Sequence, residues 1–229
     1  MKQNPLADLL NLMYPPVCLA CGKNLLGTEE HLCLSCLHHI PKTNYHLQKD
    51  NPVEERFWGK VPVFRASSFF LFNKGSSFQK ILHNLKYQGA KELGSYFGKC
   101  AGIDLLQSPD FSSVDYIIPV PLHPDKLKKR GYNQSEWIAG GLAESMNKPV
   151  DTAHLIRTQA NVSQTNKNVY ERYENTAGIF ELTDNTIFSG KHVLVVDDVL
   201  TTGSTLEACV QALLPTENIR ISLFTLALA

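Results

Sequence analysis

The sequence predicts an α/β domain with a mainly parallel sheet flanked by helices, preceded by a small cysteine-rich module. From Val61 onward, short apolar or aromatic runs typical of strands alternate with segments that carry the apolar stripe of a helix, the order typical of parallel sheets. Before that point, four of the six cysteines fall within the first 36 residues, in a segment with little apolar periodicity. The chain of 229 residues is long enough for one domain with an appendage.

The periodicity of the apolar residues defines the expected helices. Leucines and a methionine of residues 6–13 share one helical face before Pro15, and Phe78, Ile81 and Leu85 repeat at helical spacing. Residues 134–146 carry the same pattern, and residues 205–214 form a last helix that ends at Pro215.

The expected strands alternate with these helices. Residues 63–72 are rich in aromatic and β-favouring side chains, and residues 115–120 form the next strand. Residues 193–196 are apolar throughout, as a parallel strand covered on both faces requires, and residues 219–228 form a final buried strand. Ligands of such sheets bind beyond the carboxyl ends of the strands.

Composition excludes several classes of protein. The apolar fraction of 43% is too high for a disordered chain. Lys plus Arg and Asp plus Glu both number 22, so the chain lacks the global positive charge of many nucleic-acid-binding proteins. No apolar run reaches the length of a membrane span, and we expect a cytoplasmic protein without membrane insertion.

The four N-terminal cysteines form two C-x-x-C pairs, Cys18 with Cys21 and Cys33 with Cys36. Two such turns supply the four thiolates of a closed, structural zinc site, and Gly22 allows the chain to fold back beneath the metal. The alternative, a thioredoxin-like redox pair, gives the second pair no role. Cys100 and Cys209 stand alone in helix-like patterns and are interpreted as core residues.

A second motif joins the strand at 193–196 to the helix at 205–214. Asp197 and Asp198 follow the strand, and a hydroxyl-rich turn around one glycine leads into the helix, comprising Thr201, Thr202, Gly203, Ser204 and Thr205. A helix N-terminus preceded by such a turn suits a phosphate, and two acids beside it suit vicinal hydroxyls, so the motif predicts a site for a phosphorylated ribose. The turn lacks the Gly-Lys-Ser/Thr of a Walker P-loop. Alternatively, the helix is merely capped and the acids are solvated.

These residues resemble the phosphoribosyl-pyrophosphate motif of type I phosphoribosyltransferases. Residues 119–134, the stretch Leu85-Lys86-Tyr87-Gln88-Gly89 and the paired cysteines narrow the resemblance to the ComF family, competence-associated phosphoribosyltransferases with an N-terminal zinc finger. The resemblance implies a type I phosphoribosyltransferase-like sheet over residues 61–229 and a zinc-ribbon-like module at residues 1–45. The polar stretch at residues 46–60 is interpreted as a linker between them.

The resemblance also implies roles for individual residues. Asp197 and Asp198 would hold the ribose hydroxyls, and residues 201–205 the 5′-phosphate of phosphoribosyl pyrophosphate, with Mg²⁺ neutralising the leaving group. The basic cluster after the strand at 115–120 would hold the pyrophosphate, and Arg172 is a candidate contact from a polar loop. The cluster comprises Lys126, Lys128, Lys129 and Arg130.

Two functions follow from this sequence. One is phosphoribosyl transfer to a nitrogen acceptor, or binding of the sugar pyrophosphate without transfer. The other is that of a DNA-uptake accessory protein, which contacts single-stranded DNA or a helicase partner through its zinc finger and basic loop. No sequence pattern identifies the nitrogen acceptor or the oligomeric state.

Overall fold

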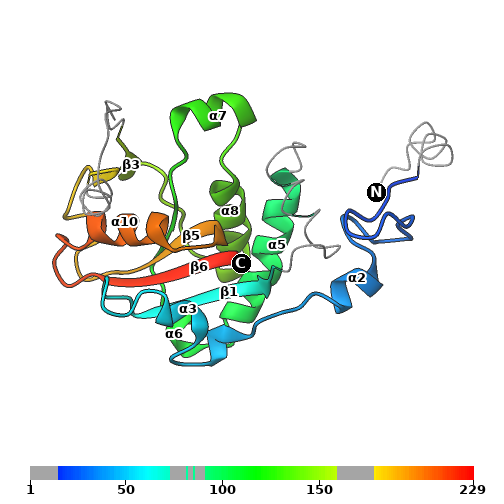
Figure 1. Ribbon diagram of the computed structural model, residues 1–229, viewed down its shortest axis with the longest axis horizontal. Helices are drawn as coiled ribbons and strands as arrows, with labels where there is room; N and C mark the ends of the chain where they lie inside the picture. The colour runs from blue at the N-terminus through cyan, green and yellow to red at the C-terminus, as the bar shows by residue number, and fades with distance from the viewer. Residues whose placement is uncertain (1–14, 73–80, 82–84, 86–90, 159–177) are drawn as a thin grey trace.

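The computed structural model of the 229-residue chain describes residues 15–72, 81, 85, 91–158 and 178–229 (Figure 1). The helix expected at residues 6–13, most of the helix around 78–85, and the candidate residue Arg172 lie outside the described residues.

The centre of the fold is a four-stranded parallel sheet in the order β1-β6-β5-β2 (Figure 1). Its strands are β1 (Arg65–Leu71), β6 (Arg220–Leu228), β5 (His192–Leu200) and β2 (Tyr116–Pro119). All four occur where the sequence predicts strands, and the α/β fold class is confirmed. β5 is longer than the predicted apolar run because β6 continues beside it as far as the Leu200–Leu228 pair.

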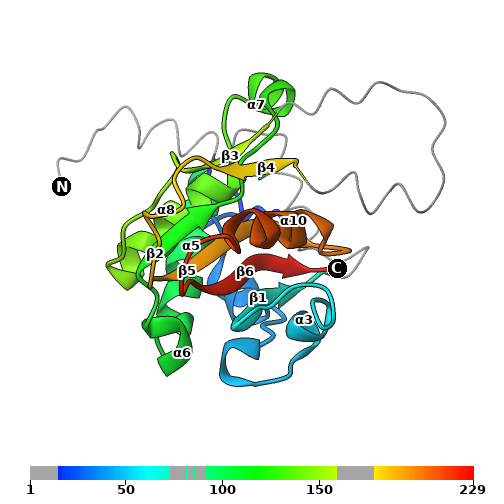
Figure 2. The same ribbon diagram turned by 90° about the vertical axis from the view of Figure 1, so that its left-hand side faces the viewer.

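Helices cover both faces of the sheet, as the apolar central strands require (Figures 1 and 2). Leu194 and Val196 of β5 pack in one core with the residues of α5 (Lys91–Leu105) and α8 (Gln134–Met146). Val193 and Val195 point to the opposite face, into a second core with α10 (Ser204–Leu213). α8 has the predicted bounds, and α10 is displaced by one residue from its predicted range.

α5 and α8 approach each other closely because glycines face each other at their crossing. A Cβ on Gly98 would lie 2.3 Å from the carbonyl oxygen of Ile138, and one on Gly141 would lie 2.1 Å from that of Ser95. This close packing fixes the position of α8, and with it the residues at the N-terminus of that helix.

Residues 46–60, predicted as a polar linker, are packed against the sheet. They include the end of η1 (Tyr45–Leu47) and the helix α3 (Pro52–Glu55), and they bury Val53 and Phe57. Asn51 explains why a polar sequence is buried here: its Oδ1 accepts hydrogen bonds from two backbone N–H groups of α3, and its Nδ2 donates to the carbonyl of Ala66 in β1 at 3.0 Å. The predicted division of the chain at residues 45 and 60 stays a prediction.

The remaining described elements are short. They are α2 (Leu34–His38), α6 (Pro109–Ser112), α7 (Pro124–Arg130) and the antiparallel pair β3 (Leu155–Arg157) and β4 (Phe180–Leu182). The cysteine-rich module shares the core of the α5 face through Leu25, Leu32 and Ile40, and the ring of His31 packs edge-on against Tyr96 of α5. Among the described residues, no helix combines the length and the apolar character needed to cross a membrane.

Candidate functional site: a cleft at the carboxyl edge of the sheet and a four-cysteine cluster

A cleft of about 330 Å³ opens beyond the carboxyl ends of β2 and β5. The pairing of these strands ends at Pro119 with Val196, whereas β5 continues along β6. One side of β5 is therefore uncovered from Asp197 onward, which is where ligands of parallel α/β sheets bind. The cleft is lined by residues 120–122, Lys126, Arg130, residues 133–135, Arg157, residues 197–199, Thr201 and Thr205.

The acid pair lies in this cleft. Asp197 and Asp198 are half-buried in the last part of β5, within the strand rather than after it. Asp197 Oδ1 accepts hydrogen bonds from Ser135 Oγ at 3.0 Å and from the backbone N–H of Asp198 at 2.9 Å. These two donors orient the carboxylate, and an oriented carboxylate can accept hydrogen bonds from hydroxyl groups of a ligand.

The hydroxyl-rich turn leads from β5 into α10 as predicted. Gly203 has a φ of 87° and serves as the N-cap, so the first N–H groups of α10 receive no side-chain cap from it. Thr202 Oγ1 lies 3.0 Å from Ser204 Oγ. Thr201 and Thr205 line the cleft, whereas the residues between them do not. The turn thus places the N-terminus of α10, with its partial positive charge, at the edge of the cleft.

Residues before β1 support this turn from behind. Arg56 Nη1 donates to the carbonyl oxygen of Thr201 at 2.6 Å. The buried ring of Phe57 lies 3.2 Å from the position that a Cβ on Gly203 would take. No sequence pattern indicates these contacts, because residues 56 and 57 fall in a segment whose polarity is typical of a linker.

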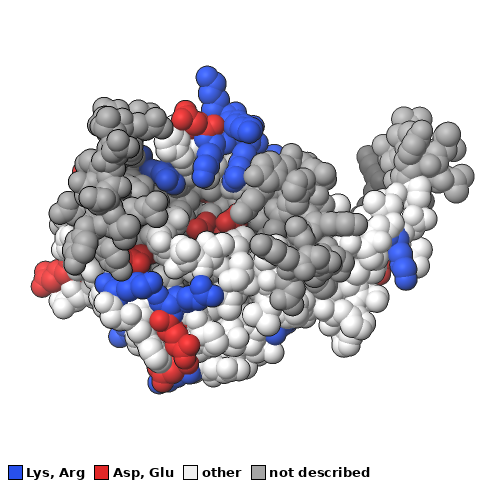
Figure 3. Space-filling view, viewed as in Figure 1, with Lys and Arg blue, Asp and Glu red and all other residues white. Residues whose placement is uncertain are grey.

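The predicted basic cluster is the helix α7, which projects from the rest of the fold at the top of Figure 1. Figure 3 shows a hollow beneath the basic side chains of this helix, with acidic side chains at its floor. Lys126 and Arg130 line the cleft, one helical turn apart. Lys128 and Lys129 do not line it and are exposed to solvent. The structure therefore separates the four predicted cations into two pairs.

Four further polar residues line the cleft without a role assigned from the sequence: Asn133, Gln134, Ser135 and Arg157. Asn133 is the N-cap of α8, and its Nδ2 also donates to the carbonyl oxygen of Val120 at 3.0 Å. The sequence does carry a signal for Asn133, Gln134 and Ser135: they stand at the capped start of a predicted helix, soon after a predicted strand. Arg157 reaches the cleft from β3.

The four predicted metal-ligating cysteines lie together near the N-terminus. The Sγ atoms of Cys18, Cys21, Cys33 and Cys36 are within 4.8 Å of one another, and those of Cys21 and Cys33 are 3.8 Å apart. Four sulfurs at about 2.3 Å from one tetrahedral zinc ion would be roughly 3.8 Å apart, so the cluster is consistent with zinc. Gly22 has a φ of 76° and closes the first turn, with its N–H donating to the carbonyl of Cys18 at 2.8 Å.

The electrostatics of this cluster favour a thiolate at one position. Burial of the Cys18 thiol opposes its ionisation, but backbone N–H groups, first that of Cys21 and then that of Cys33, outweigh it and lower the pKa to about 6. Thiolates rather than thiols bind metal ions. Burial, and next the hydrogen bond with Cys21, raise the pKa of the Cys36 thiol.

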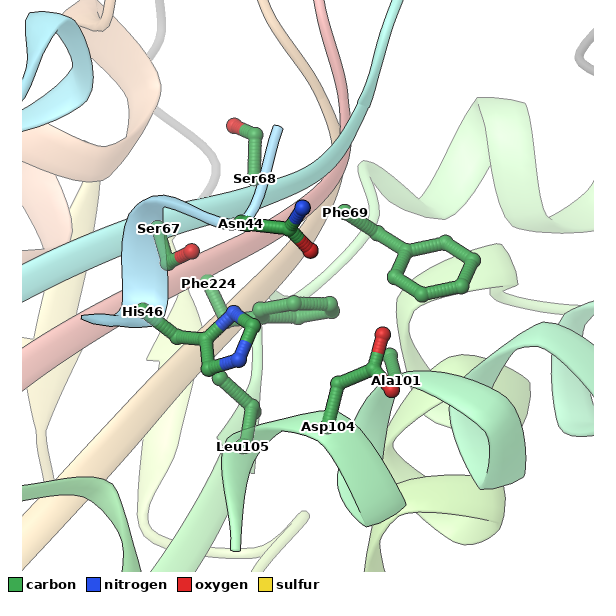
Figure 4. A pocket seen from close by; sticks show the side chains of 9 residues that line it. All are labelled: Asn44, His46, Ser67, Ser68, Phe69, Ala101, Asp104, Leu105 and Phe224. Carbon is green, nitrogen blue, oxygen red and sulfur yellow. The ribbon is translucent and has the colours of Figure 1, made fainter. Parts of the chain in front are cut away.

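A second cavity lies under β1 and is too small for a substrate (Figure 4). Its volume of about 10 Å³ is roughly that of one water molecule. His46, Ser67 and Asp104 line it, and His46 Nε2 is buried without a hydrogen-bond partner among the described residues. This cavity is a hydration site at most, and the cleft above β5 remains the candidate site.

Known proteins resemble this chain in sequence and in part of its structure. Residues 133–228 match the phosphoribosyl transferase domain family. The DNA utilization protein YhgH of Shigella flexneri is 27% identical over 207 residues, which cover 86% of this chain and 84% of that protein. Competence protein ComFC of Bacillus subtilis is 26% identical over 86% of this chain and 78% of that protein. A solved adenine phosphoribosyltransferase is 16% identical over 66% of this chain and 75% of its own, with a TM-score of 0.40.

The matched domain contains the acid pair, the hydroxyl-rich turn, α8 and the last two strands of the chain. The relatives extend the likeness along most of the chain. Residues 133–228 thus match the phosphoribosyl transferase domain family, in a chain that has a four-cysteine cluster near its N-terminus and is similar over most of its length to the DNA utilization protein YhgH and the competence protein ComFC.

Proposed function

We propose that the cleft binds phosphoribosyl pyrophosphate and transfers its phosphoribosyl group to a nitrogen nucleophile. The observation that carries this proposal is the position of Asp197 and Asp198 between two sites suited to anions. The N-terminal turn of α10 lies on one side of the acids, and Lys126 and Arg130 of α7 line the cleft with them. A sugar with two hydroxyls and a phosphate group on either side matches this order of acceptors and donors.

The 5′-phosphate would bind at the turn of residues 201–205. The N–H groups at the start of α10 and the hydroxyls of Thr201 and Thr205 supply donors there. The ribose hydroxyls would donate to Asp197 and Asp198. Ser135 holds the Asp197 carboxylate in place, so these hydroxyls meet an oriented acceptor.

The pyrophosphate would lie under α7, against Lys126 and Arg130. Magnesium fits this cleft because it is usually held by one or two carboxylates together with phosphate oxygens, and Asp197 and Asp198 supply two carboxylates. When bound, the magnesium ion would neutralise charge on the leaving pyrophosphate.

In the proposed reaction, the lone pair of the nitrogen attacks the anomeric carbon, and the bond from that carbon to the pyrophosphate oxygen breaks. Pyrophosphate leaves with the bonding electrons, and the nitrogen then loses a proton. Positive charge develops on the sugar ring as the bond breaks, and the carboxylates of Asp197 and Asp198 favour that charge.

Calorimetry with phosphoribosyl pyrophosphate and Mg²⁺ tests the binding step. The double variant Asp197→Asn/Asp198→Asn should lose at least tenfold in affinity, because two charged acceptors become amides. Asp184→Asn is the matched control, since Asp184 is exposed and outside the cleft. Unchanged affinity in the double variant would refute the proposal. Release of pyrophosphate on addition of ammonia, the simplest nitrogen nucleophile, tests transfer.

We also propose that the four-cysteine cluster binds one structural zinc ion. The support is the closeness of four Sγ atoms and the absence of a fifth histidine, cysteine or carboxylate ligand from this group among the described residues. Four thiolates leave no open coordination position, so the ion would stabilise the module and take no part in chemistry.

A second function, contact with single-stranded DNA, is favoured by Lys128 and Lys129. Both are exposed on α7 and do not line the cleft, so they are accessible to the phosphates of a nucleic acid. The names of the relatives, a DNA utilization protein and a competence protein, point the same way. DNA affinity should fall with salt and decrease further in Lys128→Ala/Lys129→Ala, with Lys191→Ala as control. Absence of binding at low salt would refute it.

A further inference from the structure

α8 begins with a side chain that the proposed contacts leave unused. Gln134 lines the cleft and is only 2% exposed, yet its Nε2 has no hydrogen-bond partner within the part of the chain that the structure describes. A buried donor without an acceptor destabilises the protein that carries it. Such groups are rare in folded proteins, and each requires an explanation.

The neighbours of Gln134 fix its place in the cleft. On one side, Asn133 Nδ2 donates to the carbonyl oxygen of Val120, the residue after β2. On the other, Ser135 Oγ donates to Asp197 at 3.0 Å. Gln134 therefore lies at the β2 side of the acid pair, whereas the turn of residues 201–205 follows β5. Lys126 and Arg130 also belong to the β2 side, because α7 connects β2 to α8 (Figure 1).

The chemistry of this side of the cleft calls for an acceptor. Lys126 and Arg130 carry only donors on their side chains, so neither can satisfy Gln134 Nε2. The first turn of the 13-residue helix α8 adds a partial positive charge. Asp197 Oδ1 already accepts two hydrogen bonds. An anionic ligand with several oxygens would provide the missing acceptor.

We propose that Gln134 and the first turn of α8 bind the diphosphate group of the ligand, with Gln134 Nε2 donating to one of its oxygens. This inference rests on the proposed function for the sugar part of the ligand. It adds a directional donor to the charge of Lys126 and Arg130. The site therefore distinguishes a sugar diphosphate from a sugar that carries only the 5′-phosphate.

Inorganic diphosphate, ribose 5-phosphate and phosphoribosyl pyrophosphate, each with Mg²⁺, are the probes for calorimetry on the full chain. Gln134→Met keeps the length of the side chain and removes the donor. It should lower the affinity for diphosphate and for phosphoribosyl pyrophosphate about tenfold, and leave that for ribose 5-phosphate unchanged. The unliganded variant should melt at the same or a higher temperature than the wild type, because an unpaired buried polar group has been removed.

Two further variants make the result specific. Gln134→Glu places a negative charge beside the diphosphate and should weaken diphosphate binding more than Gln134→Met does. This second variant tests the inference even if Gln134→Met fails to fold. Gln211→Met is the matched control, because Gln211 is exposed on α10 and outside the cleft. Equal losses for all three ligands, or no loss for diphosphate, would overturn the inference.

The same experiment separates this inference from the proposed function. If the wild type binds diphosphate in a Gln134-dependent way but does not bind phosphoribosyl pyrophosphate, the diphosphate site stands and the proposed function fails. If it binds phosphoribosyl pyrophosphate regardless of residue 134, the proposed function stands and the diphosphate role of Gln134 fails. If the wild type binds neither, both fail.

Discussion

Ser135 Oγ donates a hydrogen bond to Asp197 Oδ1 across 3.0 Å, joining two residues that are 62 positions apart in the chain. The contact ties the first turn of α8 to the end of β5, at the floor of the cleft. The contact therefore links the N-terminus of α8 to the Asp197 carboxylate, which lines the same cleft as the N-terminal turn of α10. The orientation of Asp197 thus depends on how α8 packs, as well as on its own strand.

Ser135→Ala should weaken the binding of phosphoribosyl pyrophosphate by about three- to tenfold, the effect of losing one hydrogen bond that orients a charged acceptor. Calorimetry in the presence of Mg²⁺ measures this change. Ser145→Ala is the control. Ser145 lies on the same helix but outside the cleft, and its replacement also removes hydrogen bonds, those that its Oγ donates to the carbonyl oxygens of Gly141 and Leu142. Equal affinities of the two variants would show that the Ser135 contact does not orient Asp197 for binding.

Gly203→Ala should destabilise the protein by roughly 1–2 kcal/mol, because a φ of 87° is unfavourable for a side chain. The new Cβ would also lie 3.2 Å from the ring of Phe57. Chemical denaturation measures the change in the free energy of unfolding. Gly140→Ala is the opposite case: Gly140 lies within α8 with no atom near its Cβ position, so alanine should stabilise the protein by about 0.5–1 kcal/mol. A neutral Gly203→Ala would contradict the observed backbone of the turn.

Removal of metal by a strong chelator should lower the melting temperature of the module and leave the sheet folded. The reason is that a segment with a small core depends on its metal ion for folding. Metal analysis of the purified chain should find one zinc ion per molecule, and Cys33→Ser should lose it. Cys100→Ala serves as the control, since Cys100 lies on α5 outside the cluster. Full zinc content in Cys33→Ser would refute a four-cysteine site.

His192 should make the stability of the protein sensitive to mild acid. It is 4% exposed, and its ring nitrogens lie 2.8 Å from Ser222 Oγ and 2.9 Å from Ser113 Oγ. Burial, and next the positive charge of Arg220, lower its pKa from 6.5 to about 4. A hydrogen bond with the backbone of Ser113 and the charges of Asp115 and Asp110 oppose this shift.

The sign of this effect follows from proton binding. Between pH 6.5 and 4 the unfolded chain takes up a proton at residue 192 that the folded chain does not, so the free energy of unfolding decreases as the pH falls. The decrease from this residue is about 3 kcal/mol. Denaturation from pH 7 to 4 should show a shallower decrease in His192→Gln than in wild type, with exposed His38→Gln as control. Parallel curves would contradict a neutral, buried His192.

Local pattern was sufficient to predict much of the fold. The helical periodicity of residues 134–146 gave α8 its bounds, and the apolar run before Asp197 with the glycine turn after it identified β5 and α10. The spacing of the C-x-x-C pairs predicted the cluster that Cys18, Cys21, Cys33 and Cys36 form. These features depend on residues near one another in the chain, where dihedral preferences and side-chain periodicity act directly.

Tertiary structure decided what lies around them. Residues 46–60 are polar by composition, yet Asn51 and the Arg65–Glu54 ion pair supply enough partners to pack this segment against β1, and Arg56 then supports Thr201. The packing of α8 on α5 brings Gln134 and Ser135 to the acid pair, and the early end of β2 opens the cleft there. Such long-range contacts depend on how whole elements pack, so the sequence by itself determined the elements and the motifs, and the tertiary structure decided which side chains share a site.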